Sequence, residues 1–322
     1  MSSKPEPQAD GMWFVDRTAR IPSACASGFE AGGHFSWRQS RTIKPCPAGF
    51  LTDCEAARRT NCMDIVIGGV SAYGYEQIRV WARSLVTSGF SGRKVLLAFH
   101  LEPDVIRQLE ADGIEVLPAR AAGPARVNVY MQRFWEIGLL LGQQRYRYAL
   151  TTDVRDVAFQ ADPIAWLEAH LGDHDLVVSD EGVPFADQAW NRTNLADAFG
   201  PGALDLLRHA PIINVGVFGG RAEAVRAAAV ETYLLALMAA DRAKVADQAA
   251  FNLLLKWGCF PRVRRTDDRD AFAAQLHVKL ERGQPPMLQD GLVCNAAGEP
   301  YAIVHQYDRS PDLKARVEQR YR

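Results

Sequence analysis

The feature that most constrains the fold is an alternation of short apolar runs and amphipathic segments that begins near residue 62. Apolar runs at residues 65–67 and 95–98 flank a helical pattern at residues 76–88. Strands that alternate with helices form parallel α/β sheets, because each parallel strand needs a long crossover to reach the next one. Ligands of such sheets bind beyond the carboxyl ends of the strands. The sequence therefore predicts an α/β fold with a mainly parallel sheet flanked by helices.

The same alternation continues along most of the chain and indicates a single main domain. Residues 1–61 are rich in Cys, Gly and Pro and lack periodicity, so we expect an N-terminal extension of unknown function. The main domain is expected at residues 62–310, followed by a C-terminal tail at residues 311–322. Its further predicted elements are strands at 114–117, 148–150, 175–179 and 211–220, and helices at 130–142 and 221–240.

The composition excludes several classes of partner. The 322 residues are 48% hydrophobic and 23% charged, which is ordinary for a globular protein. Lys and Arg number 37 against 38 Asp and Glu, so no net positive field attracts nucleic acid. No apolar run approaches the ~20 residues of a membrane span, and the N-terminus lacks the pattern of a signal peptide. We therefore expect a cytoplasmic protein with no integral membrane segment and no nucleic-acid partner.

Acidic residues crowd the end of one predicted strand, in the segment YALTTDVRDVAFQADP at residues 148–163. Asp153 and Asp156 lie three residues apart, and Asp162 follows. Like charges this close are unfavourable unless a solvated turn or a cation accepts them, so the segment is either a surface turn or a metal site. The phosphate-binding patterns Gly-x-x-x-x-Gly-Lys-Ser/Thr and Gly-x-Gly-x-x-Gly are both absent from the sequence. Mg²⁺ or Mn²⁺ held by carboxylates is the other general way to bind a diphosphate.

The acidic segment resembles the strand end of GT-A glycosyltransferases, close to the glycogenin-like retaining families. In that family an Asp-x-Asp motif binds a divalent cation and the diphosphate of a sugar nucleotide. Asp162 and the proline after it stand at the family's interval, so Asp156 takes the second, metal-binding position. The first position falls on Val154, and the acid stands one residue earlier, at Asp153. Residues three apart on a strand point to opposite faces, so Asp153 reaches the same ion only if the chain turns; otherwise it contacts ribose.

Three later segments carry the same resemblance, and their order along the chain matches the family. In IINVGVFGG, the resemblance implies that Asn214 and Gly216 border the donor sugar, where a missing side chain allows close approach. In ADQAAFN, it implies that Asp247 and Gln248 lie at the sugar and are catalytic. In AIVHQYD, it implies that His305 returns to the metal as the third protein ligand.

Four further residues are candidates, and two of them have a second interpretation beside the functional one. Arg133 is expected to reach the diphosphate or the base, or else to be a solvated helix arginine. Asp180 and Glu181 end the strand DLVVSDEG on the ligand side of the sheet, where they would hold an acceptor hydroxyl. Trp190 is expected either to stack on a sugar ring or to pack in the core.

Together the motifs imply a glycosyltransferase that requires Mn²⁺ or Mg²⁺. Its expected partners are a nucleotide-sugar donor and a carbohydrate or small-molecule acceptor, with retention of the anomeric configuration. A pyrophosphorylase-like nucleotidyltransferase is one alternative, although the segment GGVSAYGYEQIRV after the first strand lacks the catalytic Lys that such an enzyme needs. A non-catalytic module that binds sugar nucleotides is the other alternative.

Overall fold

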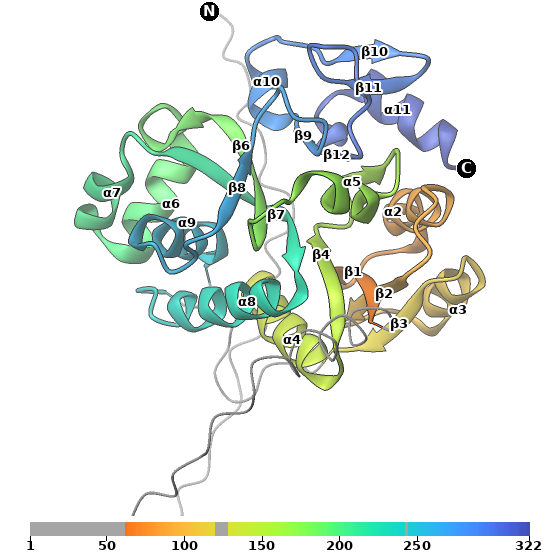
Figure 1. Ribbon diagram of the computed structural model, residues 1–322, viewed down its shortest axis with the longest axis horizontal. Coiled ribbons are helices and arrows are strands. Elements are labelled where there is room, and N and C mark those ends of the chain that lie inside the picture. Colours follow the sequence, from red (N-terminus) through yellow and green to blue (C-terminus); the bar gives the residue numbers. More distant parts are fainter. Residues whose placement is uncertain (1–61, 120–127, 242–243) are drawn as a thin grey trace, which may run out of the picture. The chain divides into compact units, whose positions relative to one another are not determined.

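The computed structural model describes residues 62–119, 128–241 and 244–322. In this part of the chain, helices cover both faces of a seven-stranded sheet, and smaller sheets lie beside it (Figure 1). The predicted N-terminal extension at residues 1–61 lies outside the described residues, and the proposed domain boundaries stay predictions.

The large sheet contains the strands predicted from the apolar runs. In spatial order its strands are β3 (Glu115–Pro118), β2 (Arg93–Ala98), β1 (Met63–Val70), β4 (Tyr146–Thr152), β7 (Pro211–Arg221), β6 (Leu176–Pro184) and β8 (Val263–Thr266). The first four are parallel to one another, and so are β6 and β8. Strand β7 is antiparallel to both of its neighbours. The predicted α/β class with a mainly parallel sheet is therefore confirmed, and β7 is the exception.

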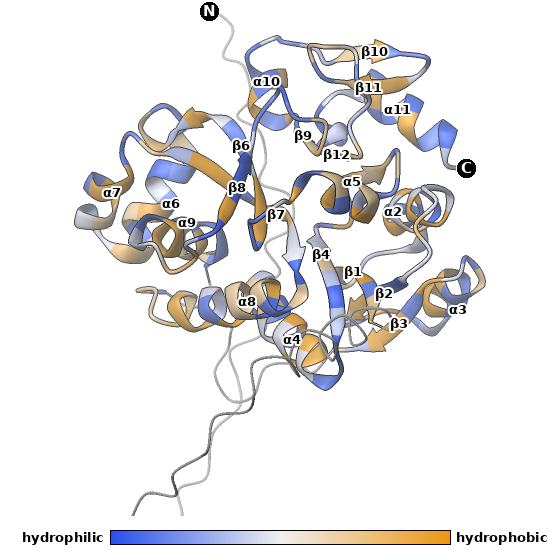
Figure 2. Cartoon of the chain, in the orientation of Figure 1, coloured by the Kyte–Doolittle hydropathy of each residue, from blue (hydrophilic) through white to orange (hydrophobic). Residues whose placement is uncertain are grey.

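Side chains of the strands alternate between two apolar layers. On β1, Val66 packs with one layer, while Ile65 and Ile67 pack with the other. The first layer is covered by α2 (Tyr75–Thr87), α3 (Pro103–Ala111) and α5 (Pro163–His170), and the second by α4 (Val129–Gln143), α8 (Ala222–Ala236) and α9 (Asp247–Trp257). Strand β1 is mainly hydrophobic, whereas α4 and α8 carry both kinds of residue, as helices with one buried face do (Figure 2).

A second, three-stranded sheet lies next to the large one and is built from very short strands. Its order is β5 (Val157–Phe159), β12 (Ile303–His305) and β9 (Ala273–Gln275), with β12 antiparallel to β5 and parallel to β9. The remaining elements are α6 (Ala189–Phe199), α7 (Pro201–Leu207), α10 (His277–Glu281), the hairpin β10 (Met287–Gln289) and β11 (Leu292–Cys294), two 3₁₀ turns (Phe185–Asp187 and Tyr307–Arg309), and α11 (Pro311–Arg320).

The segment predicted to be a C-terminal tail forms α11 and is tied to the rest of the chain. The hydroxyl of Tyr321 donates to the carbonyl of Phe159 at 2.9 Å, and Arg79 donates to the carbonyl of Tyr321 at 2.6 Å. Among the described helices, none has the length and apolar character needed to cross a membrane.

Candidate functional site

Three strand ends of the large sheet meet at one edge. Because β7 runs antiparallel, its first half lies beside the carboxyl ends of β4 and β6. The amide of Asp153, directly after β4, donates to the carbonyl of Gly216 at 2.6 Å. The side-chain amide of Asn214 donates to Glu181 at 2.7 Å, and its oxygen accepts from the amide of Gly216 at 2.7 Å. One edge of the sheet therefore collects the predicted residues of three separate segments.

Asp153, Asp156 and His305 converge at this edge. One potential ligand atom from each lies within 4.8 Å of those of the other two. The Nε2 atom of His305 is 3.5 Å from an oxygen of Asp153 and 3.7 Å from an oxygen of Asp156. With bonds of about 2.1 Å to one ion, ligand atoms lie about 3.0 Å apart in adjacent octahedral positions and about 4.2 Å apart in opposite ones. The donor set therefore fits a divalent cation after a small adjustment.

A turn between the two acids brings them to the same side. Strand β4 ends before Asp153, and the chain turns through Val154 to Asp156 before β5 begins. Val154 is buried on the opposite side, where an added Cβ at Gly68 would lie 2.6 Å from its methyl carbon. The valine at the first position of the motif therefore anchors the turn in the core, and the turn that both acids require is present.

The three-stranded sheet sets the positions of Asp156 and His305. His305 pairs with Val157 across β12 and β5, directly after the turn that carries Asp156. The amide of Gln306 donates to the carbonyl of Asp156 at 2.7 Å. On the other side of β12, Gln275 of β9 contacts the His305 ring at 2.8 Å from Nδ1. Two of the three candidate ligands therefore depend on this small sheet.

Gly216 leaves room for the side chains of Asp153 and His305. A Cβ at this position would lie 2.6 Å from Oδ2 of Asp153 and 2.6 Å from Cε1 of His305. Real side chains do not approach this closely, so any other residue at position 216 would displace a candidate ligand. The contact between Gly216 and the donor sugar stays a prediction.

Arg133 is buried between two of the predicted site acids. Its guanidinium donates to Asp153, and to Asp247 at 3.3 Å, while only 7% of the residue is exposed. A Cβ at Gly69 would lie 3.2 Å from the Cβ of Arg133. The missing side chain at Gly69 therefore lets Arg133 of α4 pack closely against β1. The interpretation of Arg133 as a solvated helix arginine is wrong. Its contact with a diphosphate stays a prediction.

The two acids of the motif have opposite pKa shifts. Burial by itself raises the pKa of Asp153, but the charge of Arg133 and the hydrogen bond with His305 outweigh it and lower that pKa. Burial and the repulsion of Asp153 raise the pKa of Asp156, against the attraction of His305. Burial lowers the pKa of His305, but both carboxylates outweigh this and raise it. Of these two acids, Asp156 is therefore the one whose charge the protein compensates less.

The start of α9 faces the same edge. Asp247 is buried, which raises its pKa despite the nearby Arg133, and its Oδ1 accepts from the amide of Gln248. The side chain of Gln248 accepts from the amide of Val215 at 3.3 Å and donates to Asn191 at 2.7 Å. Both predicted catalytic residues therefore lie beside the first half of β7, and their roles stay predictions.

Comparison with known proteins identifies the fold. No family model matches the chain, and no curated protein matches it. A crystal structure of an active-site mutant of LgtC has a TM-score of 0.51 at 15% identity, covering 80% of this chain and 94% of LgtC. The chain has the GT-A fold.

Two further solved structures are similar to this chain. LgtC, described as a galactosyltransferase in complex with donor and acceptor sugar analogs, has a TM-score of 0.49 at 16% identity, covering 80% of this chain and 94% of that one. The apo form of the glycosyltransferase GlyE from Streptococcus pneumoniae TIGR4 has a TM-score of 0.47 at 14% identity, covering 81% of this chain and 63% of that one.

Asp180 and Glu181 lie on different sides of the GT-A sheet, because adjacent strand residues point in opposite directions. Glu181 is buried beside Asn214, and burial raises its pKa. Asp180 instead lines a separate groove of about 510 Å³ together with His209, Asp267 and Arg269. The structure therefore brings Glu181 to the predicted edge and directs Asp180 into the groove.

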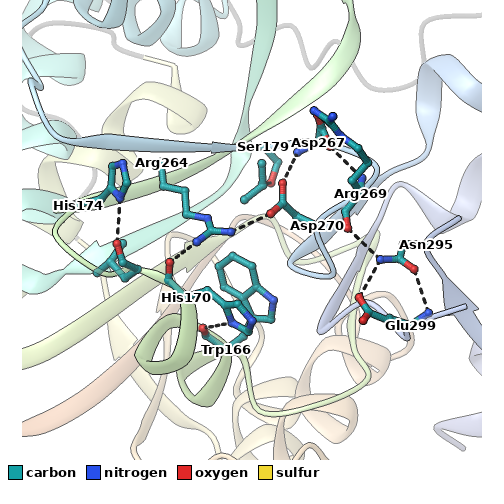
Figure 3. A network of polar contacts seen from close by, with 12 residues as sticks. Trp166, His170, His174, Ser179, Arg264, Asp267, Arg269, Asp270, Asn295 and Glu299 are labelled. Atoms are coloured by element: carbon teal, nitrogen blue, oxygen red, sulfur yellow. Dashed lines mark hydrogen bonds and ion pairs between the residues drawn. The ribbon is translucent and has the colours of Figure 1, made fainter. Parts of the chain in front are cut away.

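The wall of this groove is held by a network of polar contacts (Figure 3). Arg264 of β8 donates to the carbonyl of His170 and to Asp270 at 2.9 Å. Asp270 in turn accepts from the amide of Asp267 at 3.0 Å, and Asn295 donates to the carbonyl of Arg269 at 3.1 Å. Hydrogen bonds from Arg264 and Asn295 therefore hold the loop after β8 in place.

Sequence reasoning overlooked two residues near the site. Gln275 lies in a three-residue strand that has no readable periodicity. Tyr73 follows β1, and burial with a hydrogen bond to Tyr130 raises its pKa to about 12. Trp190 had two interpretations, and at 53% exposure it is not a core residue, so stacking on a sugar stays the prediction.

Proposed function

We propose that this protein is a metal-dependent glycosyltransferase that moves a sugar from a nucleoside-diphosphate sugar to an acceptor hydroxyl with retention of configuration. The observation that carries the proposal is the convergence of Asp153, Asp156 and His305 at the carboxyl edge of a GT-A sheet. LgtC, whose fold this chain shares, is described as a galactosyltransferase, which is the same class of reaction.

Asp153, Asp156 and His305 would hold the cation. A bound divalent ion supplies positive charge that stabilises a departing nucleoside diphosphate. Two carboxylates suit either Mg²⁺ or Mn²⁺, and the imidazole favours Mn²⁺, because nitrogen ligands suit transition metals better. We therefore propose Mn²⁺ as the preferred ion.

The remaining residues of the edge would orient the two sugars. Asp247 and Gln248 would position the donor sugar from the start of α9, close to the candidate metal ligands through Arg133. Glu181 would accept a hydrogen bond from the acceptor hydroxyl, since the hydrogen bond from Asn214 reaches one of its two carboxylate oxygens. Positioning and charge stabilisation together would supply most of the catalysis.

A thermal-shift panel tests this proposal. The full chain is incubated with UDP-, GDP-, CDP- or dTDP-sugars, with and without Mn²⁺, and Asp156→Asn serves as the control variant. A ligand at ~100 times its dissociation constant adds about 2.7 kcal/mol of stability, which is a readily measured shift. We expect one nucleotide to stabilise the wild type in the presence of Mn²⁺ and to leave the variant unshifted.

Product analysis then separates the possible reactions. Hydrolysis or transfer of the sugar supports the glycosyltransferase, and the anomeric proton signal of the product reports retention or inversion. Exchange that depends on pyrophosphate would instead identify a nucleotidyltransferase. Tight binding without turnover would identify a binding module.

A further inference from the structure

Gln275 and His305 form a buried pair beside the candidate metal ligands. They stand opposite each other on the parallel strands β9 and β12. Only 2% of Gln275 and 1% of His305 is exposed. The Oε1 atom of Gln275 lies 2.8 Å from Nδ1 of the ring, which is hydrogen-bonding distance. The ring therefore has a fixed polar neighbour on the side away from Asp153 and Asp156.

The other end of the Gln275 amide has no partner among the described residues. Its Nε2 atom is buried and makes no hydrogen bond there. A buried donor without an acceptor is destabilising, and most buried polar groups avoid this state. The Oε1 end makes one contact, with the imidazole. The hydrogen bond with His305 is therefore the contact that accounts for a buried amide at this position.

The orientation of the amide determines which ring nitrogen carries the proton. When Oε1 faces the ring, Nδ1–H donates to it, and the neutral ring keeps a lone pair on Nε2. This Nε2 atom faces Asp153 and Asp156 at 3.5 and 3.7 Å. If the amide were reversed, Nδ1 would accept a hydrogen bond, and the proton would sit on Nε2, where a cation would otherwise bind.

We propose that Gln275 is a positioning residue that fixes the Nδ1–H tautomer of His305 and so presents Nε2 to a divalent cation. The inference rests on the metal site proposed above. Residues behind a histidine ligand commonly set its tautomer and ring orientation, and their loss typically weakens metal binding 10- to 100-fold. A purely structural role is a poor explanation, because backbone pairing already joins β9 to β12.

The tautomer can be measured without any metal. We would record the ring ¹⁵N signals of the metal-free Asp153→Asn/Asp156→Asn variant at alkaline pH, where the ring is neutral, because the two carboxylates near Nε2 would otherwise attract the ring proton. The chain has 7 histidines, and the spectrum of His305→Asn identifies the signal of interest by its absence. We expect a protonated Nδ1 and an unprotonated Nε2 in this variant. A proton on Nε2 in this variant would overturn the proposal, whatever the protein does with metal.

Three variants test the consequence for the cation, with Mn²⁺ binding measured by calorimetry. Gln275→Leu removes the acceptor and should weaken Mn²⁺ binding 10- to 100-fold, while Gln275→Glu keeps an acceptor and should bind within a few-fold of the wild type. The matched control is Gln160→Leu, since Gln160 is also a glutamine of this region and its side chain hydrogen-bonds the backbone of Val293 and Tyr301 rather than the His305 ring. It should bind Mn²⁺ as the wild type does.

Each outcome has a distinct meaning. Unchanged Mn²⁺ affinity and an unchanged tautomer in Gln275→Leu would contradict the role of Gln275. Equal losses in Gln275→Leu and Gln160→Leu would also contradict it, because they would indicate a general loss of structure. If the wild type binds no Mn²⁺, the proposed function fails, and the ¹⁵N measurement still decides the role of Gln275. If Gln275→Leu does not fold, the Mn²⁺ affinity of Gln275→Glu and the tautomer of the Asp153→Asn/Asp156→Asn variant decide it.

Discussion

The two sheets contribute to the candidate site in different ways. The large sheet and the helices on it supply Asp153, Arg133 and Asp247, and the guanidinium of Arg133 contacts both carboxylates directly. The three-stranded sheet holds Asp156 and His305. Among the described residues, Asp156 has no ion pair with an arginine like the one between Asp153 and Arg133. The large sheet therefore provides a framework in which Arg133 compensates the charge of Asp153, while the small sheet holds Asp156, whose charge a bound cation would compensate.

The largest effect should come from the arginine that holds the framework together. Arg133→Met leaves Asp153 and Asp247 without their shared positive partner, and breaking a buried ion pair costs about 3–5 kcal/mol. Urea unfolding of the metal-free protein measures the loss. Arg107→Met is the control, because its pair with Asp104 is exposed and should change stability by less than about 0.5 kcal/mol. Equal losses of unfolding free energy in both variants would show that the buried ion pairs of Arg133 stabilise the protein no more than an exposed pair does.

Removing the charge of Asp153 should also destabilise the protein. Its pKa is lowered in the folded state, so it contributes stability above the ordinary value of 3.8 that disappears as the pH falls through the folded pKa. Asp153→Asn removes this contribution, and a hydrogen bond to a charged group is worth about 1.5–3 kcal/mol. The difference in unfolding free energy from the wild type should shrink at acidic pH. A difference that stays constant with pH would contradict the ion pair with Arg133.

Gly216→Ala tests the steric link between the two sheets. The added methyl group would meet both Asp153 and His305 at 2.6 Å, so we expect a loss of about 1–3 kcal/mol and at least tenfold weaker Mn²⁺ binding. Gly202→Ala in α7 is the control, since its Cβ would meet no atom within 4 Å and its backbone needs no glycine. Wild-type Mn²⁺ affinity in Gly216→Ala would mean that the cluster can shift without cost.

The two sheets also differ in what the sequence reveals. Strands β1, β4 and β7 each contain a short apolar run, and the helices between them are periodic, so this half of the fold was predictable. Strands β5, β9 and β12 have three residues each, which is too short for any period to show. The pairing of β5 with β12 joins residues almost 150 positions apart, such as Val157 and His305. Gln275 was missed because β9 is too short to show a period.

The site residues show the same contrast. His305 was found through a family resemblance, because a short apolar run before a histidine carries little information by itself. The burial of Arg133 depends on Gly69 of another element, so no pattern within α4 could reveal it. The separation of Asp180 from Glu181 follows from strand alternation, which fixes opposite directions for the two acids but not which of them faces the site.

The smallest expected change has the opposite sign and concerns Asp156 in the metal-free protein. Its pKa is raised, so its contribution to stability is complete below 3.8 and is lost as the pH rises through the folded pKa. Asp156→Asn removes this loss and should stabilise the protein at neutral pH by about 1 kcal/mol, with no gain in strong acid. Thermal unfolding without metal, from acidic to neutral pH, measures the difference. Destabilisation at neutral pH would show that Asp156 is compensated as well as Asp153 is.

The most direct test of the account is calorimetry of Mn²⁺ and nucleoside-diphosphate binding to the wild type and to Asp156→Ala. The account predicts that the wild type binds the nucleotide more tightly when Mn²⁺ is present, and that Asp156→Ala loses this metal dependence while remaining folded. Unchanged Mn²⁺ and nucleotide binding in Asp156→Ala would contradict the metal site. The acidic segment after β4 would then be only a turn, and the main support for a glycosyltransferase would be lost.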